Sequence, residues 1–280
     1  MIRPRELSSS LVAFAAKTPT LPPATHTNSY ALGGRDVLLV EPATPYEDEQ
    51  REWIAWVGGL ASQGRRPVAI AVTHHHADHV GGAAALARAL GLPVWAHAAT
   101  ASRLGVPVAR MLEDGDEVTL DGPVASRWRV LHTPGHAPGH VCFHDADRGV
   151  VVVGDMVASQ GTILIETHDG HMATYVAQLR RLSGLSARLA LPAHGEPIDD
   201  PVAHFDRYVA HRLMREEKVY AAVAAAGRGS TAAELVASAY DDAPLALHPI
   251  ARLALEAHLV KLVEDGRVET DGERYAVAGR

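Results

Sequence analysis

Hydrophobic positions in the first two hundred residues fall into short apolar runs that turn residues separate. Apolar runs bounded by Gly, Pro or Asp indicate β-strands, and segments with apolar side chains at helical spacing lie between them. Strands are predicted at residues 36–40, 68–73, 93–96, 118–120, 127–132, 141–144, 150–153 and 189–191, with a first strand inside 7–16. Helices are predicted at residues 45–58, 80–90 and 174–182. This order predicts an α/β protein with layered sheets and outer helices.

The pattern changes near Pro201, where a long amphipathic helix begins and runs to Gly227. Two further helical segments follow at residues 231–239 and 249–263. The chain then ends in two short strands around the Asp-Gly turn at residues 271–272. Three helices followed by strand, turn and strand are the element order of a winged-helix module. We therefore predict two domains, 1–203 and 204–280, the second of them winged-helix-like.

Composition narrows the class of protein. The 280 residues are 47% hydrophobic and 21% charged, as in ordinary globular proteins, and the net charge is −7. This charge disfavours a general affinity for nucleic acid or anionic membranes. The single cysteine, Cys142, cannot form an internal disulfide. No apolar run reaches the roughly 20 residues of a membrane helix, and the serines at 8–10 make a poor secretory signal. We expect a cytoplasmic protein without a membrane segment.

Histidine is the residue that stands out, because the chain holds 17 of them and they cluster. His74, His75 and His76, then Asp78 and His79, follow an apolar strand and open a helix. Strand residues two apart point the same way, so an extended turn directs His74 and His76 together and His75 elsewhere. Nothing in core packing favours so many imidazoles, since each buried ring needs a polar partner. Imidazole nitrogen and carboxylate oxygen instead suit Zn²⁺, Fe or Mn.

Three further candidates lie downstream, each in a turn just past a predicted strand. His136 follows Thr133-Pro134-Gly135, Asp155 follows Gly154, and His194 lies in Pro192-Ala193-His194-Gly195. Loops on a rigid scaffold are where proteins place functional side chains. The combined pattern predicts a metal site that these turns build together.

This pattern resembles the ligand set of the metallo-β-lactamase superfamily of hydrolases. The resemblance implies an αβ/βα sandwich that holds two divalent metal ions, preferably Zn²⁺, with Fe or Mn as alternatives. It implies that His74, His76 and His136 bind one metal, that Asp78, His79 and His194 bind the other, and that Asp155 bridges both. The histidine at position 76, where a flavo-di-iron branch has Glu, disfavours reduction of oxygen or nitric oxide.

The metal chemistry suggests the reaction. Two cations about 3.5–4 Å apart can share a hydroxide, and this hydroxide is then the nucleophile that cleaves an ester, thioester, amide or phosphodiester bond. Asp78 is the predicted catalytic residue, which orients the hydroxide and carries its proton. His140 and His132 are candidates for outer-shell support of the ligands. Cys142 lies outside the motif and is expected to be a buried strand residue.

A narrower resemblance covers nearly the whole chain. Residues 27–30 (Thr-Asn-Ser-Tyr), the segment Pro192–Pro197, residues 211–216 and the winged-helix-like tail are similar to the β-lactamase-like-protein-2 group. That group includes a single-strand endoribonuclease, and relatives of the same architecture are thioesterases acting on polyketide carriers. Residues 41–43 (Glu-Pro-Ala) depart from the Asp-Thr-Gly turn of many members.

The substrate is left open by the sequence. Residues 205–280 carry ten Lys/Arg and twelve Asp/Glu, a net charge of −2, which weakens the case for RNA. A small-molecule or carrier-bound substrate is preferred. The alternatives are a single-strand endoribonuclease, a glyoxalase II-like thioesterase and a non-catalytic winged-helix protein that binds nucleic acid. A homodimer is also left open.

Overall fold

The computed structural model describes residues 3–227 and 229–279, and no helix within these ranges is long and apolar enough to cross a membrane. The chain forms two compact units. The first unit comprises Met1–Thr133, Pro138–Thr162 and Leu185–Pro201, and the second comprises Pro134–Ala137, Ile163–Gly184 and Val202–Arg280. The predicted domain boundary at residue 203 stays a prediction.

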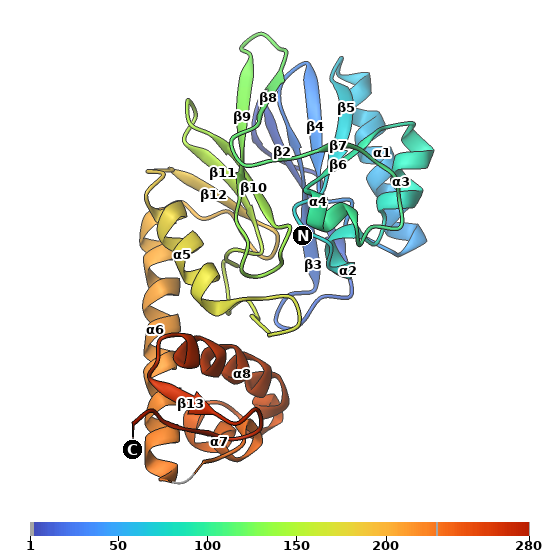
Figure 1. Cartoon of the computed structure of the whole chain (residues 1–280). Coiled ribbons are helices and arrows are strands. Elements are labelled where there is room, and N and C mark those ends of the chain that lie inside the picture. The colour runs from blue at the N-terminus through green and yellow to red at the C-terminus, as the bar shows by residue number, and fades with distance from the viewer. Residues whose placement is uncertain (1–2, 228, 280) are drawn as a thin grey trace. The chain divides into compact units, whose positions relative to one another are not determined.

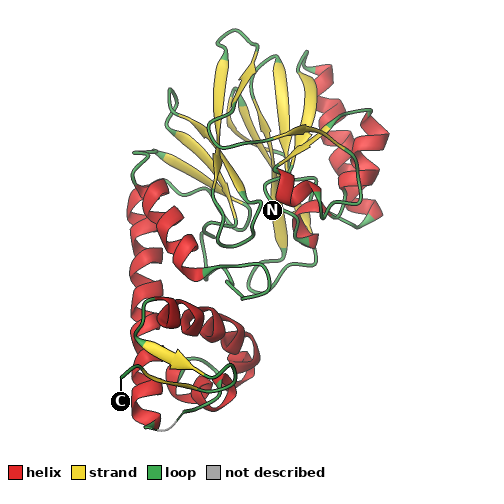
Figure 2. Ribbon diagram, viewed as in Figure 1, coloured by secondary structure: helices red, strands yellow, loops and turns green. Residues whose placement is uncertain are grey.

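Two sheets make up the first unit (Figures 1 and 2). The seven-stranded sheet runs in the order β1 to β7, antiparallel from β1 to β4 and parallel from β4 to β7. Its strands are β1 (Arg5–Ser8), β2 (Leu11–Lys17), β3 (His26–Leu32), β4 (Asp36–Val40), β5 (Arg66–Ala71), β6 (Val94–Ala96) and β7 (Val108–Met111). The second sheet has the order β12-β11-β10-β9-β8. Its strands are β8 (Glu117–Leu120), β9 (Ser126–His132), β10 (Val141–Asp145), β11 (Val150–Gly154) and β12 (Leu189–Pro192).

Apolar side chains from both sheets meet in one core, which includes Leu38, Ala71, Val130 and Phe143. A second core lies on the other face of the first sheet, under α1 (Glu47–Ser62) and α3 (Ala83–Leu90), and contains Trp53. Short α4 (Ala98–Ala101) follows β6. Two stacked sheets, with helices over the outer face of the first, confirm the predicted α/β sandwich.

The predicted helix at residues 80–90 is two helices, α2 (Ala77–Val80) and α3. Gly81 and Gly82 separate them, and a Cβ at Gly82 would lie 2.7 Å from the carbonyl oxygen of Thr44. The glycines therefore let the helices approach the chain after β4. Likewise, the single strand predicted within 7–16 is β1 and β2 joined by a turn. Strand β3 was not predicted, because its Thr, Asn and Ser side chains break the apolar pattern.

The second unit contains α5 (Met172–Ser183), α6 (Pro201–Ala226), α7 (Ala232–Ala239), the short 3₁₀ helix η1 (Leu245–Leu247), α8 (His248–Glu264) and the antiparallel pair β13 (Val268–Thr270) and β14 (Tyr275–Val277). Leu235 of α7, Leu255 of α8 and Val268 of β13 share one apolar core. Thr231 and Glu234 cap α7 reciprocally. Helices α6, α7 and α8 with the β13–β14 wing confirm the predicted winged-helix module.

Candidate metal centre

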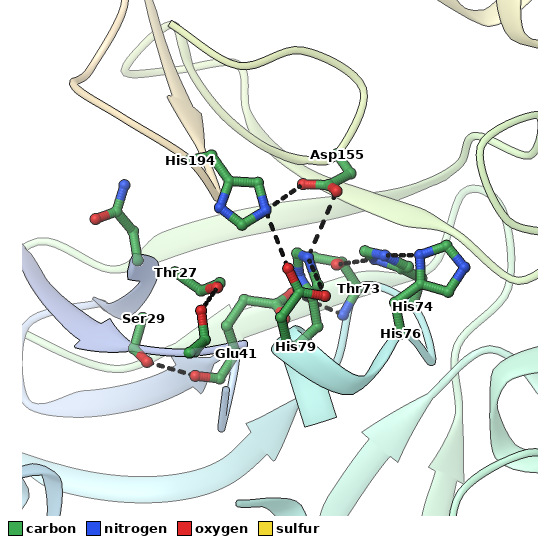
Figure 3. Close-up of polar contacts among 12 residues, drawn as sticks. Thr27, Ser29, Glu41, Thr73, His74, His76, His79, Asp155 and His194 are labelled. Atoms are coloured by element: carbon green, nitrogen blue, oxygen red, sulfur yellow. Dashed lines mark hydrogen bonds and ion pairs between the residues drawn. The ribbon is translucent and has the colours of Figure 1, made fainter. Parts of the chain in front are cut away.

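The turn at residues 74–79 leaves the sheet at the carboxyl end of the parallel strand β5. His74 is fully buried, and its Nδ1 lies 3.0 Å from the hydroxyl of Thr73. Its Nε2 lies 3.1 Å from Nδ1 of His76, so one nitrogen of each ring faces the other (Figure 3). Such an approach suits either a shared proton or two lone pairs directed at one cation.

Four side chains form a second group in the same unit. Nε2 of His194 lies 3.3 Å from Oδ1 of Asp155 and 3.4 Å from Oδ2 of Asp78. Nε2 of His79 lies 3.6 Å from Oδ2 of Asp155 and 3.7 Å from Oδ1 of Asp78. Figure 3 shows His194 and His79 both directed at Asp155. Strands β11 and β12 are parallel neighbours, which is why Asp155 and His194, just past their ends, meet.

The outer nitrogens of these imidazoles are held by fixed acceptors. Nδ1–H of His79 donates to Oε2 of Glu41 at 3.0 Å, and Nδ1–H of His194 donates to the carbonyl oxygen of His26 at 3.0 Å. An acceptor at Nδ1 fixes the tautomer and directs the Nε2 lone pair inward. Both rings are therefore oriented as metal ligands, with Nε2 facing the two aspartates.

The electrostatics of the group are those of a cation site. Burial alone would raise the pKa of Asp78, but His79 and the hydrogen bond from His194 lower it to about 2. Burial opposes the charge of His194, yet Asp155 and Asp78 raise its pKa to about 10. The carboxylates also raise the pKa of buried His79 well above its ordinary value, against the effect of burial. In the metal-free protein, protons on the imidazoles thus balance the carboxylates.

The donor atoms fit a divalent metal ion. In a tetrahedral zinc site with bonds of about 2.0–2.1 Å, neighbouring ligand atoms lie roughly 3.3 Å apart. The distances of 3.3 to 3.7 Å among His194, His79, Asp155 and Asp78 are close to that spacing. His74, His79 and Asp155 form another group of compatible donors. Within the described ranges, Nε2 of His79 is buried and makes no hydrogen bond, as expected of an atom reserved for a ligand.

His136 lies in the turn Pro134–Ala137 between β9 and β10, which groups with the second unit. Its Nδ1–H donates to the carbonyl oxygen of Leu164 at 3.1 Å. This bond again leaves Nε2 as the nitrogen able to ligate. Gly135 has a φ of 129°, and a Cβ there would lie 2.4 Å from backbone atoms of Tyr175, so this turn requires glycine.

The two outer-shell candidates differ in their contacts. Nε2 of His140 accepts the backbone N–H of Asp155 at 3.1 Å, and its Nδ1 lies 2.8 Å from the Thr133 hydroxyl. His140 therefore fixes the peptide that carries Asp155. Nε2–H of His132 donates to the carbonyl oxygen of Pro138 at 2.9 Å, and its ring stacks on that of His97. Its role as outer-shell support stays a prediction.

Sequence reasoning missed the contribution of Glu41. This residue is 1% exposed and has a left-handed φ of 65°. Its Oε2 accepts from His79, and its Oε1 accepts the backbone N–H of Thr73 at 3.0 Å. One carboxylate thus holds both ends of the histidine turn. The signal was present, because Glu41 directly follows the apolar strand at 36–40, as Asp155 follows 150–153.

Asn28 of β3 supports the turn that carries His194. Its Nδ2 donates to the carbonyl oxygens of Pro192 at 3.0 Å and Gly195 at 2.8 Å. Its backbone N–H donates to the carbonyl oxygen of Ala193 at 2.7 Å. The polar residues of β3 kept this strand from being predicted, and they include one that supports the turn of His194. Cys142 is fully buried in β10, as expected.

Comparison with protein families decides what this arrangement is. The model of the metallo-beta-lactamase superfamily matches residues 22–194, well over half of the chain, and that of the beta-lactamase associated winged helix domain matches residues 231–276. The chain belongs to the metallo-β-lactamase superfamily. Membership confirms the predicted resemblance and places the chain among metal-dependent hydrolases.

Relatives within the superfamily match most of the chain. The β-lactamase-like protein 2 homologue of Caenorhabditis elegans is 30% identical over 249 residues, which is 87% of this chain and 80% of the relative. An atrochrysone carboxyl ACP thioesterase of Aspergillus chevalieri is 30% identical over 258 residues, or 86% of this chain and 77% of the relative. The narrower resemblance to the β-lactamase-like-protein-2 group is therefore confirmed.

Two solved structures bear on fold and metal. A metallo-β-lactamase family protein from Thermus thermophilus has a TM-score of 0.78 and 25% identity, and the match covers 97% of this chain and 100% of that protein. Another relative, crystallised in a di-iron-bound form, has a TM-score of 0.51 and 28% identity over 66% of this chain and 95% of its own. The superfamily fold thus holds two metal ions in at least one relative.

Proposed function

We propose that this chain is a two-metal hydrolase that cleaves a thioester or ester of a small or carrier-bound acyl group. The observation that carries the proposal is the group of Asp78, His79, Asp155 and His194, whose donor atoms lie 3.3 to 3.7 Å apart. Zn²⁺ is the proposed metal, with Fe or Mn as alternatives that the same donors accept. By the family resemblance, His74, His76 and His136 hold the first metal, Asp78, His79 and His194 the second, and Asp155 both.

When bound, two such cations supply an acidified water and a Lewis acid for the substrate carbonyl. The chain's own residues do the rest. Glu41 and the carbonyl of His26 keep His79 and His194 in the ligating tautomer. The carboxylate of Asp78 is partly exposed and points into the group, so it can accept a proton from an incoming water. Its low pKa keeps it ionised at neutral pH, so it accepts a hydrogen bond from that water and orients it.

Two observations favour an acyl substrate over nucleic acid. Two relatives, matched over 86% of this chain and 76–77% of their own length, are named as atrochrysone carboxyl ACP thioesterases. The C-terminal segment 205–280 has a net charge of −2, whereas phosphate backbones need a basic surface. The single-strand endoribonuclease and the non-catalytic nucleic-acid binder are thus the weaker alternatives, and each becomes an outcome of the test.

The test compares His76→Ala with His75→Ala, its neighbour in the same turn that the proposal leaves outside the ligand set. Metal content is measured, together with turnover of acyl-pantetheine thioesters, p-nitrophenyl esters and single-stranded RNA. We expect His76→Ala to lose metal and at least about 100-fold in thioester turnover, while His75→Ala keeps both.

Equal activity of the two variants would refute the two-metal mechanism. Turnover confined to RNA would replace the acyl substrate by the endoribonuclease alternative. Retention of RNA without any turnover would leave the non-catalytic binder. Activity only on glutathione thioesters would select the glyoxalase II-like alternative.

A further inference from the structure

Arg212 of α6 carries a buried positive charge. Its side chain is 3% exposed, and Nη2 donates to the carbonyl oxygen of Ile163. The guanidinium carbon lies 5.4 Å from the centroid of the Tyr175 ring. Among the described residues, none supplies a carboxylate that pairs with it. A buried charge without a carboxylate partner lowers the stability of the folded state. We therefore expect the contacts of Arg212 to serve a function.

Those neighbours also hold the turn that carries His136. Ile163, whose carbonyl Arg212 binds, precedes Leu164, whose carbonyl accepts Nδ1–H of His136 at 3.1 Å. Arg212 thus fixes the peptide next to the one that orients the imidazole. All of these residues belong to the second unit.

Tyr175 forms a second connection between Arg212 and the same turn. Its backbone is so close to Gly135 that a Cβ on the glycine would lie 2.4 Å from its N and Cα atoms. The backbone N–H of His171, one turn earlier at the start of α5, donates to the carbonyl oxygen of Gly135 at 2.8 Å. The His136 turn thus contacts two segments, one at Ile163–Leu164 and the other at the start of α5. Arg212 contacts both of them.

We propose that Arg212 is a positioning residue for His136. It holds the Ile163–Leu164 peptide and the start of α5 in the arrangement that keeps Nδ1–H of His136 donated and Nε2 available to a metal. The inference rests on the proposed function, in which His136 is a ligand. It gives the long helix of the C-terminal unit a direct effect on metal binding.

Arg215 supplies a matched control one helical turn away. It is buried on the same helix, lies over an aromatic ring (Tyr240, 4.4 Å) and donates to a backbone carbonyl, that of Ala239, at 3.0 Å. It differs in having a carboxylate partner, Asp242, and in contacting neither Ile163 nor Tyr175. Loss of either arginine should disturb the helical core similarly, but only Arg212 is connected to His136.

The experiment uses full-length Arg212→Met, Arg212→Lys and Arg215→Met, with His136→Gln as reference. Stepwise Co²⁺ affinities and the visible Co²⁺ spectrum are measured by titration against a chelator. We expect Arg212→Met to weaken one of the two binding steps by about 10- to 100-fold and to change the spectrum as His136→Gln does. Arg212→Lys, which keeps one donor for Ile163, should recover part of the loss. Arg215→Met should keep both affinities, even where it lowers the melting temperature as much.

Metal-free protein separates this inference from the proposed function. NMR of ¹⁵N-histidine should show a protected Nδ1–H of His136 in the parent and in Arg215→Met, and its loss in Arg212→Met. A parent that binds fewer than two metals would overturn the proposed function, and the ring resonance would then decide the role of Arg212. If Arg212→Met and Arg215→Met agree in affinities, spectrum and resonance, Arg212 is merely structural and the inference is wrong.

Discussion

Two histidines of this chain lie in opposite electrostatic surroundings. His194 faces the carboxylates of Asp155 and Asp78, which outweigh burial and raise its pKa to about 10. His211 on α6 is half-buried beside Arg212 and Arg215, and burial together with these cations lowers its pKa to about 4. The first imidazole attracts a positive charge and the second repels one.

This difference shows what a histidine needs in its surroundings to serve as a metal ligand. The turn at residues 74–79 carries four histidines, whereas residues 211–215 carry one histidine beside two arginines, whose protonated guanidinium groups offer no lone pair to a metal. Only the first is supplied with aspartates at ligand distance, and only there do carbonyl and carboxylate acceptors direct Nε2 inward. The carboxylates therefore decide which group binds a cation.

The largest expected effect comes from removing the carboxylate between the two proposed metals. Asp155→Asn keeps the shape but removes the charge that faces His79 and His194. We expect loss of at least one metal ion and a fall in turnover well beyond about 100-fold, more than loss of an outer-shell partner produces. Elemental analysis and turnover measure this. The control is Asp242→Asn, which removes the carboxylate partner of Arg215 and should retain metal. A similar loss of metal in this variant would contradict the proposed difference between the two regions.

Glu41→Gln should have the next largest effect. A glutamine could present its amide N–H to His79 and so favour the wrong tautomer, and it would bind the Thr73 peptide less well. We expect affinity for one metal to fall about 10- to 100-fold, as measured by chelator competition. Glu49→Gln is the control, since Glu49 is also buried and accepts a backbone N–H, that of Lys17, far along the sequence from the histidine turn. Equal losses of metal affinity in both variants would mean that any buried amide has this effect and that Glu41 has no specific role.

Much of the fold could be predicted from periodicity, because apolar runs such as 36–40 and 150–153 are strands buried in one core. The turns that carry the candidate ligands could also be located from the sequence, since each lies just past such a run. Strand β3 was not, because its polar side chains bind the distant turn of His194, and such pairing depends on tertiary contacts. The role of Glu41 required the structure for the same reason: its partners Thr73 and His79 lie more than thirty positions away.

The pH dependence of stability should distinguish the two regions more finely. The folded-state pKa of His211 is lower than its unfolded value of 6.5, so the unfolded chain takes up this proton first. Its contribution to the free energy of unfolding is therefore complete above pH 6.5 and is lost as the pH falls toward 4. In metal-free protein, His211→Asn should reduce this loss by on the order of 1–2 kcal/mol after allowance for solvent screening. Urea unfolding at pH 7.5 and 4.5 gives the difference. Parallel pH profiles for parent and variant would show that burial and the two arginines do not lower this pKa.

The smallest effect on turnover is expected from substitution of Cys142. This residue lies close in sequence to the candidate ligands, but it belongs neither to the His194 group nor to the His211 region. It is fully buried in β10, 3.3 Å from the Thr133 hydroxyl and 3.7 Å from the carbonyl oxygen of Val153. If carboxylates and imidazoles alone make the first region reactive, Cys142→Ala removes only packing and should cost about 1 kcal/mol of stability. Turnover per bound metal should be unchanged. A loss comparable to that of Asp155→Asn would instead show that the contact of the thiol with Thr133, which also contacts His140, is needed to hold Asp155 in place.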